Sequence, residues 1–270
     1  MSASQEVITT STPPAAHAAS EGSGIHISIK AEPLFHIGGF PVTNGLFLSS
    51  IILVLLASGA FVLGKKIKFI PGKLQNLAEV TAQSILEFMD AALGSRHQSE
   101  RYFPLIATIF LIVLFSNWIG LLPGVGSILF YSEGPAAAGA PLFRAPSSDL
   151  NFTLALALIT VLVTNILGVL AIGVGPHLKK FLNFRSPLAF FTGILEFISE
   201  CARIISFSFR LFGNIFAGEV LLTVISFLLP YLVPIPFFFL EIFVGFIQAF
   251  IFAMLALVFI GMAVQEHEAH

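Results

Sequence analysis

The chain has 270 residues, of which 56% are hydrophobic and only 10% are charged, and 30 of them are phenylalanine. With a mean hydropathy of +0.94, this composition excludes an ordinary soluble domain and predicts a protein that crosses a membrane several times. The formal net charge of −2 provides no basic surface, so nucleic-acid binding is excluded as a function class.

The N-terminal segment, residues 1–31, is polar and rich in small residues, and it has no positive stretch ahead of an apolar core. We therefore predict a disordered tail on the non-cytoplasmic side of the membrane, not a cleaved signal peptide. Residues 32–270 form the membrane-embedded domain in this prediction.

Several later segments are apolar over about 20 residues or more, which is the length of one helical crossing. They predict five crossings, at about 44–64, 103–122, 152–174, 188–229 and 234–264. Between the first two, residues 74–93 alternate so that apolar side chains share one helical face and polar side chains share the other. This pattern predicts an amphipathic helix on the membrane surface. The predicted fold class is an all-α polytopic membrane protein.

The last two crossings are predicted to form a long helical hairpin, with Pro230, Pro234 and Pro236 at its turn. The stretch 188–229 would make about 60 Å of helix, which is roughly twice the hydrocarbon thickness of a bilayer. A helix of this length must kink or lie strongly tilted.

Lysine and arginine residues predict the orientation of the chain. They gather in two loops, as Lys65, Lys66, Lys68, Lys73, Arg96 and Arg101 between crossings one and two, and as Lys179, Lys180 and Arg185 between three and four. Because cytoplasmic loops collect positive charge, both loops are assigned to the cytoplasm. The N-terminus then lies outside and the C-terminus inside.

Arg210 lies within the fourth predicted crossing. An arginine cannot lose its charge in a protein, and burying it near the bilayer centre costs between about 2.5 and about 17 kcal/mol. Glu219 is nine residues away, roughly 13 Å along the helix, and is out of reach. We therefore expect the compensating charge to come from elsewhere. Arg203, in contrast, has Glu200 three residues away and can pair locally.

Most of the remaining buried polarity lies on the same two segments. Helical spacing places residues 196, 200, 203, 210 and 214 on one face of the fourth crossing, and residues 241 and 248 on one face of the fifth. We call this set the polar seam, and we expect the two helices to share it. Interhelical packing alone is the structural alternative for such a seam.

Several blocks of the sequence resemble the a subunit of the bacterial F-type rotary ATP synthase. The most specific block is Ser206-x-x-x-Arg210-Leu-Phe-Gly-Asn214, followed by Ala217-Gly218-Glu219. Further blocks occur in the order of the family: Pro71–Glu79, Phe115–Gly124, Asp149–Thr153 and Gln248–Phe252. The resemblance covers the chain from about Glu32 onward.

The resemblance implies a stator subunit in the inner (plasma) membrane of the cell. Such a subunit conducts H⁺ or Na⁺ past a rotating ring of small c-type hairpin subunits, each with one carboxyl group, and couples this flux to ATP synthesis. Peripheral-stalk b-type subunits are the other implied partners. In this reading the chain is the ion-translocating subunit of a two-sector ATPase and does not itself act on ATP.

The resemblance also implies roles for individual residues. Arg210 would face the ring carboxylate, favour its ionised form, and block leakage between two offset half-channels. The outer half-channel would contain Asn214, Glu219, Glu241 and Gln248, with Asp149 at its mouth, and the cytoplasmic half-channel would contain Glu196, Glu200 and Ser206.

Two positions depart from the family pattern. Ile204 follows Arg203, where proline is common. Glutamate occupies both position 219 and position 241, where relatives often have a Glu/His pair. Two glutamates close together could titrate as a coupled pair.

The main alternative function is a self-contained channel or secondary transporter, which would need an internal counter-ion for Arg210. A passive membrane scaffold is a third possibility. The sequence has no Gly-x-x-x-x-Gly-Lys-Ser/Thr loop, so no directly bound nucleotide is predicted. Neither a cofactor nor a metal ion is predicted, and the chain has a single cysteine, Cys201.

Overall fold

The computed structural model describes residues 32–37, 40–122, 125, 128–130, 140–175, 186–229 and 231–265. The predicted tail at residues 1–31 and the basic residues Lys179, Lys180 and Arg185 lie outside these described residues.

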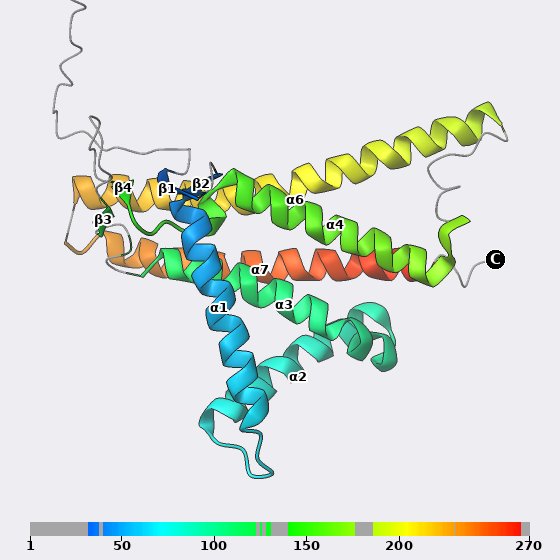
Figure 1. The fold of residues 1–270 in the computed structure, drawn as a ribbon, viewed down its shortest axis with the longest axis horizontal. Coiled ribbons are helices and arrows are strands. Elements are labelled where there is room, and N and C mark those ends of the chain that lie inside the picture. Colours follow the sequence, from blue (N-terminus) through cyan, green and yellow to red (C-terminus); the bar gives the residue numbers. More distant parts are fainter. Residues whose placement is uncertain are drawn as a thin grey trace, which may run out of the picture.

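Long helices make up most of the described chain (Figure 1). They are α1 (Asn44–Lys65), α2 (Lys73–Leu93), α3 (Arg96–Gly120), α4 (Leu150–Ile172), α6 (Pro187–Leu228) and α7 (Pro234–Gln265). Of these described helices, all except α2 are long and apolar enough to cross a membrane, which makes five candidate spans. The prediction of an all-α, multi-pass membrane protein is confirmed.

Short elements accompany the helices: strands β1 (Pro33–Ile37), β2 (Phe40–Thr43), β3 (Leu129–Phe130) and β4 (Ala140–Pro141), and the 3₁₀ helix η1 (Pro146–Ser148). β1 pairs with β2 and β3 with β4, both antiparallel. The sequence prediction did not include these strands, because runs of two to five residues carry too little periodicity to identify.

α1 is apolar around its whole circumference and is largely exposed, as expected of a helix surrounded by lipid. The Thr43 hydroxyl caps its N-terminus by accepting a hydrogen bond from the Leu46 amide at 3.3 Å. In Figure 1, α1 runs across the long axis of the molecule, whereas α6 and α7 run along it.

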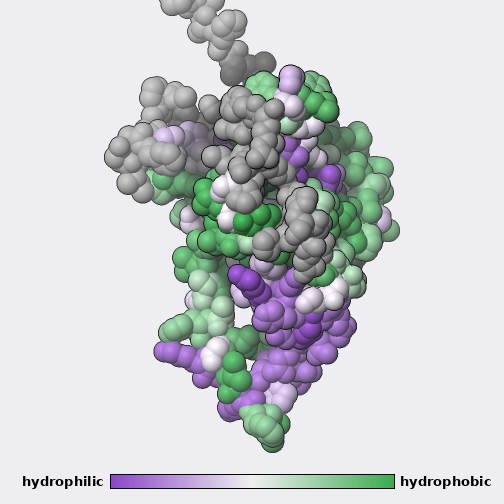
Figure 2. Space-filling view, turned by 90° about the vertical axis from the view of Figure 1, so that its right-hand side faces the viewer, coloured by the Kyte–Doolittle hydropathy of each residue, from purple (hydrophilic) through white to green (hydrophobic). Residues whose placement is uncertain are grey.

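α2 is amphipathic, as predicted, and it ends at Gly94, whose φ of 68° is the left-handed conformation that glycine adopts without strain. Figure 2 shows the hydrophilic side chains gathered over the lower part of one face, where α2 and the start of α3 lie. Leu74, Leu77 and Phe88 remain exposed on α2 and are available to contact lipid.

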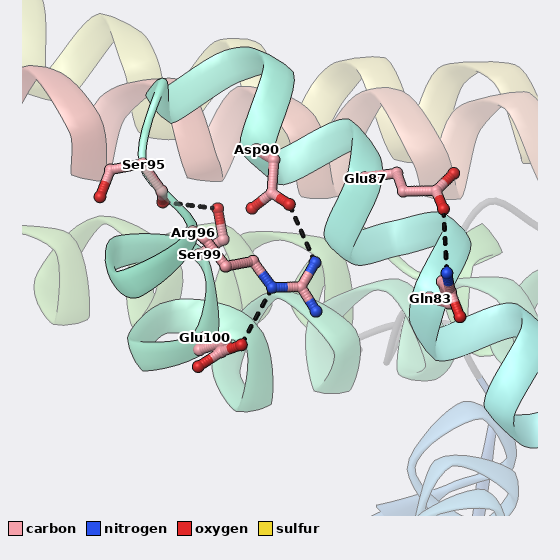
Figure 3. A network of polar contacts seen from close by, with 7 residues as sticks. All are labelled: Gln83, Glu87, Asp90, Ser95, Arg96, Ser99 and Glu100. Carbon is pink, nitrogen blue, oxygen red and sulfur yellow. Dashed lines mark hydrogen bonds and ion pairs between the residues drawn. The ribbon is translucent and has the colours of Figure 1, made fainter.

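α3 begins at Arg96, several residues before the predicted start at about 103. The Arg96 guanidinium bridges Asp90 of α2 and Glu100 of α3, at 2.9 Å in each case (Figure 3). These ion pairs stabilise a polar first turn that hydropathy alone does not detect. The Ser99 hydroxyl, and after it Arg96, hold the pKa of Asp90 below its usual value.

The core lies where α3, α4, α6 and α7 pack together. α3 lies against α7, and α4 lies against both α6 and α7. The small residues Ala249, Ala253 and Ala256 of α7 are buried and allow the neighbouring helices to approach closely. On α3, the Asn117 amide donates to the Gly245 carbonyl at 2.9 Å, and this bond fastens α3 to α7.

α6 and α7 form the predicted hairpin and lie side by side. α6 is continuous over 42 residues, about 63 Å, and its N-cap is Ser186, whose hydroxyl accepts from the Ala189 amide at 3.1 Å. α7 has 32 residues, about 48 Å. Both helices are longer than the hydrocarbon thickness of a bilayer, so they fit within it only at a large tilt.

Candidate functional site: the polar seam of α6 and α7

Arg210 is exposed on α6. Its Nη2 reaches the Ser206 hydroxyl at 3.4 Å, one turn earlier on the same helix. Within the described part of the chain, no carboxylate lies within ion-pairing distance, 4.0 Å, of this guanidinium. The geometry therefore agrees with the prediction that the charge that compensates Arg210 comes from elsewhere than its own helix.

The side of α6 opposite Arg210 is fastened to α4. Ser208 and Thr153 are both fully buried, and their hydroxyl oxygens lie 3.0 Å apart. This hydrogen bond, in which either hydroxyl can donate, joins α6 to α4. Ser208 and Arg210 are two residues apart, about 200° around the helix, so this bond turns Arg210 away from the bundle.

Asn214 and Gln248 join α6 to α7 one turn beyond Arg210. The Asn214 amide donates to the Gln248 carbonyl oxygen at 2.8 Å. Gln248 is buried, and its Nε2 has no hydrogen-bond partner among the described residues. The predicted polar seam is confirmed at this pair, and it includes an unused buried donor.

Glu219 pairs with Arg144, a residue for which no role was predicted from the sequence. Glu219 Oε1 lies 3.8 Å from Nε of Arg144, whose side chain is only 6% exposed. The same Nε donates to the Ser148 hydroxyl at 3.1 Å. Glu219 Oε2 is buried and has no hydrogen-bond partner within the described ranges. One carboxylate oxygen is therefore close to a cation and the other is free.

Glu241 is buried on α7, where its carboxylate lies directly against the backbone of Gly218 on α6. A Cβ atom at Gly218 would overlap this carboxylate, so glycine is the residue that allows the close approach. Glu219 follows Gly218 in sequence, yet no hydrogen bond joins Glu219 and Glu241 in the described part of the chain. The suggestion that these two glutamates titrate together stays a prediction.

Asp149 is buried at the start of α4 and acts as its N-cap, because its carboxylate accepts from the Asn151 amide at 2.9 Å. It lies in van der Waals contact with the position that a Cβ of Gly45 on α1 would occupy. An aspartate directly before a long apolar run is a recognisable capping signal. The structure thus gives Asp149 a structural task in addition to the one predicted from the resemblance.

Toward the other end of α6, Glu200 Oε1 lies 2.9 Å from Nη1 of Arg203, and both side chains are largely buried. The Asn165 amide of α4 approaches Glu200 Oε2 at 3.4 Å, and the Arg203 guanidinium lies 3.9 Å from the centre of the Phe259 ring on α7. The local pairing of Arg203 with Glu200 is confirmed. Glu196 is half-buried one turn earlier, and Ser206 is exposed.

The chemistry offered by these groups is the exchange of protons or ions, not bond making. Carboxylates bind and release protons, and amides and hydroxyls can relay them or coordinate a hydrated cation. The described residues contain no group of three or more His, Cys, Asp or Glu side chains arranged to hold a metal ion. The acids lie on both sides of Arg210 along α6, so two separate polar regions flank one cation.

Comparison with known proteins agrees with this arrangement. The protein-family model described as "ATP synthase A chain" matches residues 46–261. The chain is similar to "ATP synthase subunit a" of Campylobacter jejuni subsp. doylei, at 34% identity over 87% of this chain and 91% of that protein. It is also similar to "ATP synthase subunit a 1" of Syntrophotalea carbinolica, at 36% identity over 80% of this chain and 83% of that protein. A more distant relative is "ATP synthase subunit a" of Moorella thermoacetica, at 28% identity over 88% and 99%.

Proposed function

The chain belongs to the ATP synthase A chain family, and from this membership we propose that it is the ion-conducting stator subunit of a rotary ATP synthase. In this proposal H⁺ or Na⁺ passes through two offset half-channels to a rotating ring of small c-type hairpin subunits, and the flux drives ATP synthesis. The chain translocates ions as part of the complex and leaves ATP chemistry to other subunits. It lies in the inner (plasma) membrane of the cell, with its N-terminus outside and its C-terminus in the cytoplasm.

The observation that carries the proposal is the exposed guanidinium of Arg210, which has no carboxylate partner among the described residues. A cation on an apolar helix is stable in a membrane only if a carboxylate or water reaches it. Within the described residues no acid does so, and the buried opposite face of α6 directs Arg210 outward. A ring of subunits that each bring one carboxylate past this point would satisfy the requirement, and the fixed charge would favour the ionised form of each carboxylate in turn.

The two polar regions of α6 and α7 supply candidate routes to and from the ring. We assign Asn214, Glu219, Glu241 and Gln248 to the outer half-channel, with Asp149 at its mouth, and Glu196, Glu200 and Ser206 to the cytoplasmic half-channel. The free buried atoms support the outer assignment, since Gln248 Nε2 and Glu219 Oε2 are both available to water or to an ion in transit.

The proposed partners follow from the same family membership. The exposed face of α6 around Arg210 would contact the c-type ring, and peripheral-stalk b-type subunits would hold the chain against rotation. The apolar, exposed surface of α1 suits contact with lipid.

Cysteine crosslinking tests whether the Arg210 face meets the ring. In a Cys201→Ala background, which removes the exposed native thiol, cysteines are introduced at the exposed positions Ser206, Asn214 and Ala217. We expect each to crosslink to a small membrane subunit that carries a carboxyl group. Ile215, which is buried on the same turn of α6, is the matched control and should not crosslink.

Ion flux completes the test. Vesicles that contain the whole complex with Arg210→Ala should lose ATP-driven pumping or leak ions without coupling. Transport by the purified chain alone, with no crosslinks from the exposed positions, would contradict the proposal and support a self-contained transporter.

A further inference from the structure

Two arginines of α6 lie one heptad apart and have opposite environments. Arg203 and Arg210 are seven residues apart, which places them about 10 Å apart along the axis and within about 20° of the same helical face. Arg203 is largely buried and ion-paired, whereas Arg210 is exposed and has no carboxylate partner in the described ranges. The two arginines therefore have nearly equivalent positions around the helix, and their neighbouring groups determine which of them is paired.

Groups from three helices surround the pair of Arg203 and Glu200. Glu200 of α6 pairs with it at 2.9 Å, and the side chains of Glu200 and Arg203 are 13% and 18% exposed. Phe259 of α7 presents its ring face to the guanidinium at 3.9 Å, and Asn165 of α4 lies 3.4 Å from the second oxygen of Glu200. A cation held in this way by a carboxylate and an aromatic face is neutralised within the bundle.

We propose that Glu200 is a charge-compensating residue that neutralises Arg203, so that a passing carboxylate meets Arg210 as the unpaired cation of this face of α6. The proposal rests on the function proposed above, because it concerns how the ring carboxylate is handled. It assigns Glu200 a task other than carrying the ion, although Glu200 still lines the cytoplasmic half-channel.

The physical reason is competition for the carboxylate. If Arg203 lost its partner, a second permanent cation would be available about two turns from Arg210 on the same face. A carboxylate of the ring would then be attracted to two places, and a cation entering the cytoplasmic half-channel would be repelled. A carboxyl group without a partner can bind a proton and become neutral, whereas a guanidinium cannot release one. Loss of Glu200 alone is therefore more harmful than loss of Arg203 alone.

The experiment compares Glu200→Gln, Arg203→Gln and the double variant in the whole complex, with ATP-driven ion pumping measured in inverted vesicles. We expect Glu200→Gln to reduce pumping about tenfold or more, Arg203→Gln to stay within about twofold of the wild type, and the double variant to pump at least about threefold better than Glu200→Gln. Glu196→Gln, one turn away, is the matched control, and Arg203→Gln should not restore whatever pumping Glu196→Gln loses.

Restoration of pumping when Arg203→Gln is added to Glu200→Gln distinguishes charge compensation from ion carrying by Glu200. If Glu200 carries the ion itself, the double variant will be as poor as Glu200→Gln, and the proposal is overturned. Normal pumping by Glu200→Gln overturns it as well, and so does failure of Arg203→Gln, because Arg203 would then be needed in its own right.

Assembly of the complex is measured by co-purification of the other subunits. If Glu200→Gln fails to assemble, the double variant still decides, because the proposal requires removal of Arg203 to restore both assembly and pumping. A double variant that does not assemble, or that assembles and does not pump, overturns it. Failure of the proposed function would show differently, as normal coupled pumping by Arg210→Ala in the same vesicles.

Discussion

Gly218 on α6 leaves room for the buried carboxylate of Glu241 on α7. Because a Cβ atom at this position would overlap the Glu241 carboxylate, Gly218→Ala must move a buried acid or separate the two helices. Because the atoms in the way are the end of a flexible side chain, we expect a loss of about 1 kcal/mol in the free energy of unfolding, measured for the purified protein in detergent.

The control for this prediction is Gly59→Ala in α1. Gly59 is also helical, but a Cβ atom there would meet nothing within 4 Å. The same substitution should leave stability unchanged or raise it by up to about 1 kcal/mol, since alanine is the better helix former. Equal effects at the two positions would mean that the contact with Glu241 is not what requires glycine.

Individual residues show which contacts can be predicted from the sequence and which cannot. The lack of a carboxylate within reach of Arg210 on its own helix and the ability of Arg203 to pair with Glu200 follow from distances along one helix, and both were predicted. The pairing of Arg144 with Glu219 was not, because the two residues are 75 positions apart and only the packed bundle brings them together. The contact of Arg203 with Phe259 was not predicted either, for the same reason.

At the scale of elements, the corner between α2 and α3 depends on the charge of Asp90. Its pKa is lowered from the usual 3.8 by Ser99 and by Arg96. A lowered pKa means that the ionised form stabilises the fold above about pH 4 and that this contribution disappears as the pH falls through the lowered pKa. We therefore expect Asp90→Asn to lower the unfolding temperature at pH 7 and to have little effect at strongly acidic pH.

Glu87→Gln is the control on the same helix, because Glu87 accepts a hydrogen bond from Gln83 at 3.2 Å and takes part in no ion pair among the described residues. Its difference from the wild type should depend less on pH than that of Asp90→Asn. Equal pH dependence for both variants would show that the ion pair with Arg96 does not stabilise this corner.

The helices themselves were largely predictable, and the reason is physical. A crossing needs about 20 apolar residues, so hydropathy identified all five candidate spans to within a few residues except at the start of α3. There the first turn is polar and contains the exposed ion pairs of Arg96 with Asp90 and Glu100, and a hydropathy window scores such a stretch as loop. Local rules thus predict the elements better than they predict the contacts between them.

At the scale of the whole molecule, α1 and α6 make different demands on the bilayer. α1, with 22 residues, is about 33 Å long and matches a hydrocarbon layer of about 30 Å, whereas α6 is about 63 Å long. If both helices stay within the same layer, α6 must tilt by roughly 60° from the membrane normal. The crossing of α1 over the direction of α6 and α7 in Figure 1 fits this difference.

Spin labels placed along both helices would measure this tilt. We expect label depth in vesicles to change by about 1.5 Å per residue along α1, but by only about 0.7 Å per residue along α6. Equal gradients, with the ends of α6 in water, would contradict the tilted arrangement.

The distant pairing of Arg144 has a consequence for biosynthesis. Arg144 is made 75 residues before Glu219, which at about 5 to 20 residues per second is a delay of roughly 4 to 15 s. During that interval Arg144 has no ion-pair partner, because Glu219 has not been synthesised. The segment around η1 therefore stays at the aqueous surface until α6 has been inserted. The final seating of this loop is therefore a late step of maturation, and truncated chains that end before α6 should expose Arg144 to quality-control proteases.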